Sequence, residues 1–331
     1  MVLVITRSDV AKALELDEVI RAVEAAHVEL ATGTAIQPVR PEVGLPESSV
    51  LMIPMVAASG PHNIAGVKLL TDSPDNPANG RPRQQSVILV ADPTAGTPEA
   101  VIDGALVTRL RTAAASAVAT KHLANPDATT LGLVGAGPLA AAHVAAISSV
   151  RPIERVVVWS RSSATIRTFI DDVCAGPNGD VTVEVADEPR DVVAAADVLC
   201  TVTPSRTPII EGGWLHAGMH LNVVGAPPRP DHREIDSAVV AACRVVLDSR
   251  DVALRESGAV LAALADGAVT AEHVHDELGE VIVGTVPGRR RRSDITLYNS
   301  VGIAIQDIVT ARVVIDAVRE RHLAIHIDLT A

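Results

Sequence analysis

A glycine-rich turn stands near the middle of the chain, where residues 131–140 read LGLVGAGPLA. It follows an apolar strand and precedes a helix, as the G-x-G-x-x-A motif of dinucleotide-binding folds does. Gly135 permits a tight turn, Gly137 lets the backbone approach a pyrophosphate, and the helix N-terminus offers N–H groups to phosphate oxygens. Pro138 fits the first helical turn, where its missing N–H is not needed. The motif predicts a dinucleotide site that includes Gly135, Gly137, Pro138 and Leu139, and the alternative is an ordinary strand–turn–helix crossover.

The end of the next strand selects between nicotinamide cofactors. Residues Arg155–Trp159 read as a strand, and Ser160 and Arg161 follow it. A carboxylate at this place would hold the ribose 2′-hydroxyl of NAD, whereas an arginine accommodates the 2′-phosphate of NADP. Because no carboxylate is present, Ser160 and Arg161 favour NADP(H) over NAD(H). The alternative is that Arg161 is a solvated loop residue.

Lys68 is a further residue whose type and position suggest a role in chemistry. It stands within an apolar strand, Ala65–Leu70, in a chain that has only three lysines among its 28 basic residues. Partial burial lowers the pKa of a lysine and lets it exchange a proton near neutrality. We therefore expect Lys68 to anchor an anion or to donate a proton.

The elements around the glycine turn follow a strand–helix alternation. Expected strands are Thr129–Val134, Arg155–Trp159, Val181–Val185, Val198–Val202, His220–Val224 and Arg244–Leu247, and expected helices include Ala140–Ile147 and Asp191–Ala196. Such βαβ units predict an α/β fold with a doubly wound parallel sheet.

The remaining segments differ in character. A helix is expected over residues 8–33 with Ser8 as its N-cap, and short strands of a mixed or antiparallel sheet over 37–98. Thr112 is expected to cap an Ala-rich helix, Ala113–Ala124. A long amphipathic helix is expected over Val301–His322, followed by a strand within Leu323–Ile327.

Composition excludes several classes of protein. The 331 residues are 48% hydrophobic and 21% charged, with a net charge of -12 and four aromatic side chains, so phosphate backbones are repelled and few rings can stack on bases. Three cysteines without CxxC spacing argue against a disulfide framework and a zinc site, and no metal is expected. With no signal peptide and no spanning segment in view, we expect a cytoplasmic protein that binds neither nucleic acid nor membrane.

A series of ordered motifs covers nearly the whole chain and resembles the ornithine cyclodeaminase / mu-crystallin family. The motifs are Asn76-Pro77, Asp92–Pro98, Asp103-Gly104, Thr108–Ala114, the glycine turn, Cys200–Ser205, His220–Ala226 and Ile295–Gly302. The resemblance implies a homodimer with a Rossmann domain (113–300) and a discontinuous, sheet-rich substrate and dimerisation domain (1–112 with 301–331). It also implies a nicotinamide cofactor and an α-amino or α-imino acid substrate.

The resemblance further implies individual site residues. Arg40, Lys68 and Arg111 match the family's anchors for the substrate carboxylate, and a guanidinium fork with a point charge suits that group. Lys68 and Arg111 are the expected catalytic residues, and Val301 is expected beside the substrate. Positions that line the cofactor in the family are matched by Thr112, Thr203, Val224, Gly225 and Ser300. Pro138 and Leu139 stand where the family often has a glutamine.

One departure from the family bears on the reaction. Ornithine cyclodeaminases have an aspartate two residues after the glycine that corresponds to Gly225, and this chain has Pro227 there, in a loop that is one residue longer. Asp231 could replace that aspartate only through space. We therefore expect an NAD(P)H-dependent reductase of α-imino acids such as pyrroline-2-carboxylate, or the reverse amino-acid dehydrogenase. Cyclodeamination, a dehydrogenase that condenses two amino acids, and a non-catalytic NADP-dependent binding protein are the alternatives.

Overall fold

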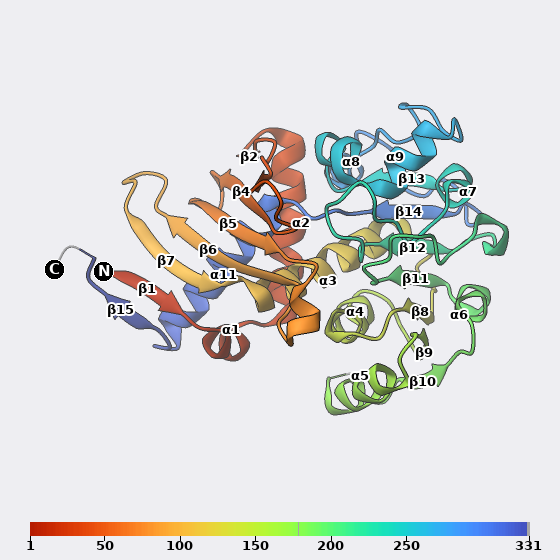
Figure 1. Cartoon of the computed structure of the whole chain (residues 1–331), viewed down its shortest axis with the longest axis horizontal. Coiled ribbons are helices and arrows are strands. Elements are labelled where there is room, and N and C mark those ends of the chain that lie inside the picture. The colour runs from red at the N-terminus through yellow and green to blue at the C-terminus, as the bar shows by residue number, and fades with distance from the viewer. Residues whose placement is uncertain (178, 330–331) are drawn as a thin grey trace. The chain divides into compact units, whose positions relative to one another are not determined.

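The computed structural model describes residues 1–177 and 179–329 (Figure 1). The chain divides into two compact units. The first unit comprises Met1–Arg111 and Ile303–Ala331, and the second comprises Thr112–Gly302. Within the described residues, no helix is both long and apolar enough to cross a bilayer.

The first unit is built on a mixed eight-stranded sheet. Its strand order is β15-β1-β7-β6-β5-β4-β2, with β3 paired to β4. The strands are β1 (Val2–Ile5), β2 (Ala35–Ile36), β3 (Val43–Gly44), β4 (Leu51–Ser59), β5 (Ile64–Asp72), β6 (Gln84–Ala91), β7 (Pro98–Asp103) and β15 (Ile325–Ile327). Only β1 and β7 pair in parallel.

Helix α11 (Ala304–Glu320) covers one face of this sheet. It packs on β4, β5 and β6, and α2 (Leu16–Thr32) and α1 (Arg7–Ala13) pack against it (Figure 1). Side chains alternate along each strand, so every second residue points toward α11. Ile53, Met55, Lys68 and Ile88 are such residues, and all four are buried. The core of the first unit therefore lies between α11 and these strands.

Two helix boundaries differ from the expectations. The helix expected over residues 8–33 is two helices, because Leu14 and Glu15 are extended between α1 and α2. Its cap is Thr6 rather than Ser8: the Thr6 hydroxyl accepts from the Asp9 N–H, and the Asp9 carboxylate accepts from the Thr6 N–H at 2.9 Å. Gly33 ends α2 in the left-handed conformation, as expected.

Thr112 does not begin a helix. Helix α3 runs from Gly104 to Leu123, so Thr112 lies within it and the expected N-cap is wrong. The start is instead marked by Asp103, whose carboxylate accepts from the Ala105 N–H at 3.2 Å. An aspartate followed by glycine commonly marks a turn, and here the same carboxylate provides a helix cap.

The second unit contains the expected parallel sheet. Its order is β10-β9-β8-β11-β12-β14-β13, and every pairing is parallel. The strands are β8 (Thr130–Val134), β9 (Arg155–Trp159), β10 (Thr182–Val185), β11 (Val198–Thr201), β12 (His220–Val223), β13 (Arg244–Leu247) and β14 (Thr296–Asn299).

Helices cover both faces of this parallel sheet. One hydrophobic cluster joins the strands to α4 (Pro138–Ser148) and α5 (Ser163–Ala175). A second joins them to α6 (Pro189–Ala195), α7 (Ser237–Ala242), α8 (Arg250–Glu256) and α9 (Gly258–Ala265), and α10 is Leu278–Ile282. Short 3-10 helices occupy Asn76–Asn79 and Gly212–Trp214. The doubly wound α/β fold with a second, sheet-rich unit is thus confirmed.

Candidate active site

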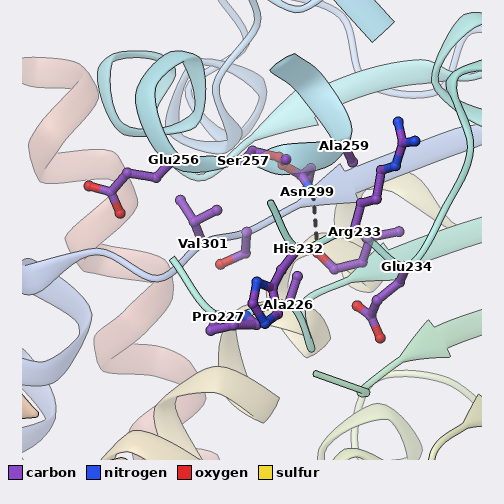
Figure 2. A pocket seen from close by; sticks show the side chains of 13 residues that line it. Ala226, Pro227, His232, Arg233, Glu234, Glu256, Ser257, Ala259, Asn299 and Val301 are labelled. Atoms are coloured by element: carbon purple, nitrogen blue, oxygen red, sulfur yellow. Dashed lines mark hydrogen bonds between the residues drawn. The ribbon is translucent and has the colours of Figure 1, made fainter. Parts of the chain in front are cut away.

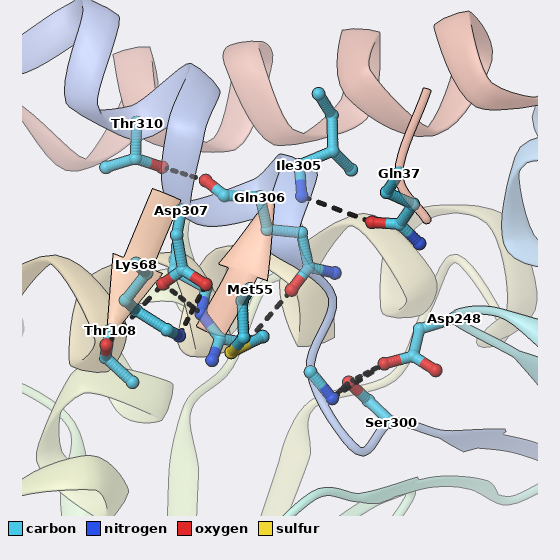
Figure 3. A network of polar contacts seen from close by, with 12 residues as sticks. Gln37, Met55, Lys68, Thr108, Asp248, Ser300, Ile305, Gln306, Asp307 and Thr310 are labelled. Carbon is cyan, nitrogen blue, oxygen red and sulfur yellow. Dashed lines mark hydrogen bonds and ion pairs between the residues drawn. The ribbon is translucent and has the colours of Figure 1, made fainter. Parts of the chain in front are cut away.

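Three charged side chains meet on the inner face of the mixed sheet in the first unit. Lys68 comes from β5 and Asp307 from the first turn of α11 (Figure 3). Arg111 comes from α3. The Lys68 Nζ lies 2.5 Å from Asp307 Oδ2, and the Arg111 Nε lies 3.1 Å from Asp307 Oδ1. All three are buried, and the structure therefore brings together two of the residues expected from the sequence through a carboxylate that was not expected.

The local fold explains why these groups are buried. Lys68 pairs with Met55 on β4 and with Ile88 on β6, so strand alternation directs it inward among apolar neighbours. Asp307 belongs to the apolar face of α11, between Ile305 and Ile308, which are also fully buried. A charge in such surroundings must be paired to be tolerated, and each carboxylate oxygen of Asp307 holds one cation.

Burial and neighbouring charges shift the ionisation of the cluster. Burial is the largest of the effects that together lower the pKa of Lys68 from 10.5 to about 7; Arg111 and Arg40 also lower it, and Asp307 opposes them. Burial on its own raises the pKa of Asp307, but attraction to Arg111 and Lys68 outweighs that effect and holds it below its ordinary value. Near neutral pH, Lys68 can therefore exist in either protonation state.

Arg111 is held in place by a second contact. Its Nη1 donates to Gln306 Oε1 at 2.9 Å, and the Gln306 amide lies 3.1 Å from His27 Nε2. Burial lowers the pKa of His27 to about 4, so the ring is neutral and Nε2 accepts the amide hydrogen. Thr108, one turn earlier on α3, donates to Asp307 at 3.5 Å. The guanidinium orientation is thus set by side chains from three helices.

Arg40, the third expected anchor, lies in the segment between β2 and β3. It is buried, and its Nη1 lies 3.5 Å from the Met55 sulfur. Its positive charge acts on Lys68, as noted above, so it belongs to the same group of side chains. Three basic side chains, Arg40, Lys68 and Arg111, thus belong to one group in the first unit, and basic side chains suit an anionic ligand.

The expected cofactor residues of the second unit lie, with one exception, after the carboxyl ends of its parallel strands. Gly135 and Gly137 follow β8, Ser160 and Arg161 follow β9, Thr203 follows β11, Val224 and Gly225 follow β12, Ser300 follows β14, and Pro138 and Leu139 begin α4. Thr112 is the exception, because it lies within α3. Ligands of open α/β sheets bind at this edge.

The glycine turn has the geometry that a pyrophosphate requires. Gly135 has φ +111°, and a Cβ there would lie 3.0 to 3.1 Å from Val202 and Thr203 atoms. A Cβ on Gly137 would meet no atom within 4 Å, so the backbone is open to a ligand at that point. Gly137 is also the N-cap of α4, and no side chain caps this helix. The residues present therefore fit a dinucleotide phosphate.

Two buried carboxylates organise the neighbouring loops. Glu234 accepts hydrogen bonds from Thr203 and Gly225, and Asp248 accepts from the Ser300 hydroxyl at 2.7 Å and the Gly302 N–H at 2.8 Å. Burial raises the pKa of Glu234, and its hydrogen bonds oppose that rise. Neither residue could be singled out from the sequence, because nothing in their local sequence distinguishes them from surface acids.

A small pocket borders these loops (Figure 2). Val301, the expected substrate residue, lines it together with Pro227, His232 and Glu256. Pro227 stands where the resemblance to the family leads one to expect an aspartate, and Asp231 is 61% exposed and pairs with His232 at 2.9 Å. Arg161 is exposed at the end of β9. Across residues 1–177 and 179–329, no group of three His, Cys, Asp or Glu side chains could hold a metal ion.

Comparison with known proteins agrees with this geometry. A family model described as the ornithine cyclodeaminase/mu-crystallin family matches residues 2–322. The ketimine reductase mu-crystallin of Rattus norvegicus is 35% identical over 285 residues, 86% of each chain. The structure of Thermococcus litoralis Δ1-pyrroline-2-carboxylate reductase in complex with NADH and L-proline superposes with a TM-score of 0.94 at 32% identity, covering 98% of this chain and 100% of that one. An archaeal alanine dehydrogenase dimer with bound NAD gives a TM-score of 0.92 at 29% identity, covering 99% of each chain.

Proposed function

Since the chain belongs to the ornithine cyclodeaminase/mu-crystallin family, we propose that it is an NAD(P)H-dependent reductase of α-imino acids, or the reverse amino-acid dehydrogenase. The observation that carries this proposal is the buried cluster of Lys68, Asp307 and Arg111. The relatives named above reduce ketimines or pyrroline-2-carboxylate, or oxidise alanine, as their names state. Pyrroline-2-carboxylate and alanine both carry a carboxylate on the reacting carbon.

The proposed roles follow from the chemistry of the cluster. Arg111 and Arg40 hold the substrate carboxylate, because a fixed guanidinium matches the two carboxylate oxygens. Lys68 supplies a proton to the developing amine nitrogen, since burial brings its pKa to about 7. The nicotinamide, when bound, supplies the hydride to the C=N carbon. Val301 borders the substrate, and Asp307 keeps the two cations apart and oriented.

The second unit is proposed to bind the dinucleotide and the first to bind substrate, with the division at residues 112–113 and 300–301 as the resemblance implies. Thr112, Thr203, Val224, Gly225 and Ser300 are proposed to line the cofactor, and the glycine turn with Pro138 and Leu139 to hold its pyrophosphate. Thr203 and Gly225 contact the same carboxylate, which supports a shared surface.

NADP(H) is proposed as the preferred cofactor. Arg161 is exposed directly after β9, next to Ser160, and no carboxylate stands at the end of that strand. Replacement of Arg161 by alanine is expected to weaken NADPH binding about tenfold and to leave NADH binding unchanged, because only NADPH carries the 2′-phosphate. The structures named above were solved with NADH or NAD, so equal affinity of the wild type for NADH and NADPH would overturn this preference.

Cyclodeamination is not proposed, since Pro227 cannot engage a substrate amine and Asp231 pairs instead with His232. The assay is cofactor oxidation by the purified protein with a panel of ketimines, pyrroline-2-carboxylate among them. Lys68→Met is expected to lower kcat/KM at least 100-fold, whereas Lys12→Met, which changes an exposed lysine on α1, leaves it unchanged. If the wild type binds the cofactor but turns over no ketimine, the proposal fails in favour of a binding protein; ammonia release from ornithine would favour a cyclodeaminase.

A homodimer is proposed from the outer face of the mixed sheet. Val56, Leu69, Val87 and Leu89 lie on neighbouring strands, on the face opposite α11, and each is more than a third exposed. Neighbouring exposed apolar side chains of this kind are typical of surfaces that bind another protein. We propose that a second copy of the chain covers it.

A further inference from the structure

Glu234 lies at the junction of three loops in the second unit. It is fully buried, and its side chain accepts four hydrogen bonds. Oε1 accepts from the Thr203 N–H at 2.6 Å and the Thr203 hydroxyl at 2.8 Å. Oε2 accepts from the Gly225 N–H at 2.8 Å and the Thr201 hydroxyl at 2.9 Å. Each oxygen therefore holds one backbone N–H and one hydroxyl.

The two backbone N–H groups need this carboxylate. Thr203 and Gly225 stand just beyond the ends of β11 and β12, where the sheet no longer supplies partners. The two loops are in direct contact, because a Cβ on Gly225 would lie 2.1 Å from the Thr203 nitrogen. Without Glu234, these two partly buried N–H groups would lose the acceptor that both now share.

Glu234 also fixes the side chain of Thr203. Because the Thr203 hydroxyl donates to Glu234, its methyl group points to the glycine turn, where a Cβ on Gly135 would lie 3.1 Å from it. The carboxylate thus links the loops after β11 and β12 to the turn after β8. These are the loops proposed above to hold the dinucleotide.

Glu234 is itself held rigidly. Its carbonyl accepts from the Ile209 N–H at 2.7 Å and the Ile210 N–H at 3.1 Å, and Ile235 forms a β-bridge with Ile210. A rigid acceptor transmits its position to the groups that it binds.

From these contacts we infer that Glu234 is a positioning residue of the cofactor site, which sets the spacing of the loops after β8, β11 and β12 and thereby the affinity for the nicotinamide cofactor. This inference rests on the proposed function. It assigns Glu234 no contact with substrate and no proton transfer.

The test compares Glu234→Gln with Asp197→Asn by fluorescence titration with NADPH. Glutamine keeps the shape of the Glu234 side chain, but its NH2 group is a donor and cannot accept from the backbone N–H that it faces. We therefore expect Kd for NADPH to rise at least tenfold. Asp197 accepts from the Thr129 and Thr130 N–H groups at 3.0 Å each, at the amino end of β8. Asp197 thus also binds two backbone N–H groups, but at the opposite edge of the sheet. Asp197→Asn is therefore expected to lower the Tm of the protein without changing Kd for NADPH.

Kinetics separate positioning from a general loss of structure. Glu234→Gln is expected to raise KM for NADPH and to leave KM for the ketimine unchanged. If Glu234→Gln does not fold, Thr201→Val removes one hydroxyl from the same carboxylate and is expected to raise Kd about threefold. An unchanged Kd in the folded variant overturns the inference. Absence of NADPH and NADH binding by the wild type would instead overturn the proposed function.

Discussion

Each oxygen of the Asp307 carboxylate holds a different cation, Lys68 on Oδ2 and Arg111 on Oδ1. The carboxylate therefore sets the separation of the two groups that the proposed reaction needs. Replacing it with a neutral amide removes the attraction while keeping the shape, and leaves two buried cations without their anion.

We predict that Asp307→Asn lowers kcat/KM for the ketimine about 100-fold, since misplacement of catalytic groups by about 1 Å has that effect. It should also lower the free energy of unfolding by about 3 kcal/mol, the usual cost of breaking a buried ion pair. The control is Asp316→Asn on the same helix, where the carboxylate is 57% exposed and pairs with Arg312. Wild-type kinetics in a folded Asp307→Asn protein would contradict the role given to the carboxylate.

Lys68 gives a pH dependence with a definite sign. A proton donor must be protonated, and burial brings the pKa of Lys68 down from 10.5 to about 7. We predict that log kcat/KM for imine reduction falls above pH 7 with a slope that approaches one. This decrease above pH 7 should be absent from the residual activity of Lys68→Met. A wild-type kcat/KM that stays constant up to pH 9 would exclude Lys68 as the proton donor.

Some residues of the candidate site can be recognised from the sequence and others cannot, for physical reasons. Gly135 and Gly137 could be identified from sequence because a tight turn before a helix leaves a fixed spacing, and Lys68 because a lysine is out of place in an apolar strand. The side chains of Asp307 and Glu234 bind partners that lie more than thirty residues away along the chain. The one exception named here is Gly225, a partner of Glu234. The available signal for Asp307 is an acid on the apolar face of a helix, between Ile305 and Ile308.

At the scale of elements, the apolar outer face of β4, β5 and β6 is the feature with a measurable consequence. We predict that Leu69→Glu converts a dimer into a monomer, because it places a charge in the middle of the proposed interface. Sedimentation velocity measures the mass. Val185→Glu is the matched control, since Val185 is a 53% exposed apolar residue on β10, in the second unit, and its variant should stay dimeric. A monomeric wild type, or a dimeric Leu69→Glu, would refute the proposed interface.

Element boundaries show where local sequence stops being informative. Strands β9 and β13 match their expected bounds, because short apolar runs between polar residues mark buried strands clearly. The expected helix over residues 8–33 breaks at Leu14 and Glu15, neither of which is a helix breaker, and Thr112 lies inside α3. The starts of α1 and α3 depend on capping by Thr6 and Asp103, and nearby Ser8 and Thr112 are equally suitable caps by residue type.

At the scale of the whole molecule, three buried histidines make stability depend on pH. Burial lowers the pKa of His27 and His143 to about 4 and that of His220 to about 3, against 6.5 in the unfolded chain. The unfolded state thus binds more protons below pH 6.5, and stability must fall as the pH falls from 6.5 toward 4.

We predict that each of these histidines costs about 2 kcal/mol of unfolding free energy at pH 5 relative to pH 8. Urea denaturation at the two pH values measures the difference. It should shrink by about 2 kcal/mol in His143→Gln, because one titrating group is removed. The exposed His275→Gln should leave it unchanged, and an equal pH effect in His143→Gln and the wild type would contradict the account.

The doubly wound architecture of the second unit could be inferred from strand–helix alternation, because parallel strands require crossover helices. The first unit could not be derived in the same way. Its sheet recruits β1 and β15 from the two ends of the chain and is covered by α11, and no periodicity within a segment encodes such distant pairings. For that unit, the ordered motifs shared with the family were the informative signal.

The central claim is that Arg111, with Arg40, holds the carboxylate of an α-imino acid for reduction. The most direct measurement is kcat/KM for pyrroline-2-carboxylate compared with 1-pyrroline, the same ring without the carboxylate, in the wild type and in Arg111→Met. We predict that the wild type prefers the carboxylated substrate at least 100-fold and that Arg111→Met loses most of this preference, since a charged hydrogen-bonded pair contributes about 3 kcal/mol. Equal turnover of the two substrates by the wild type, or an undiminished preference in Arg111→Met, would contradict it.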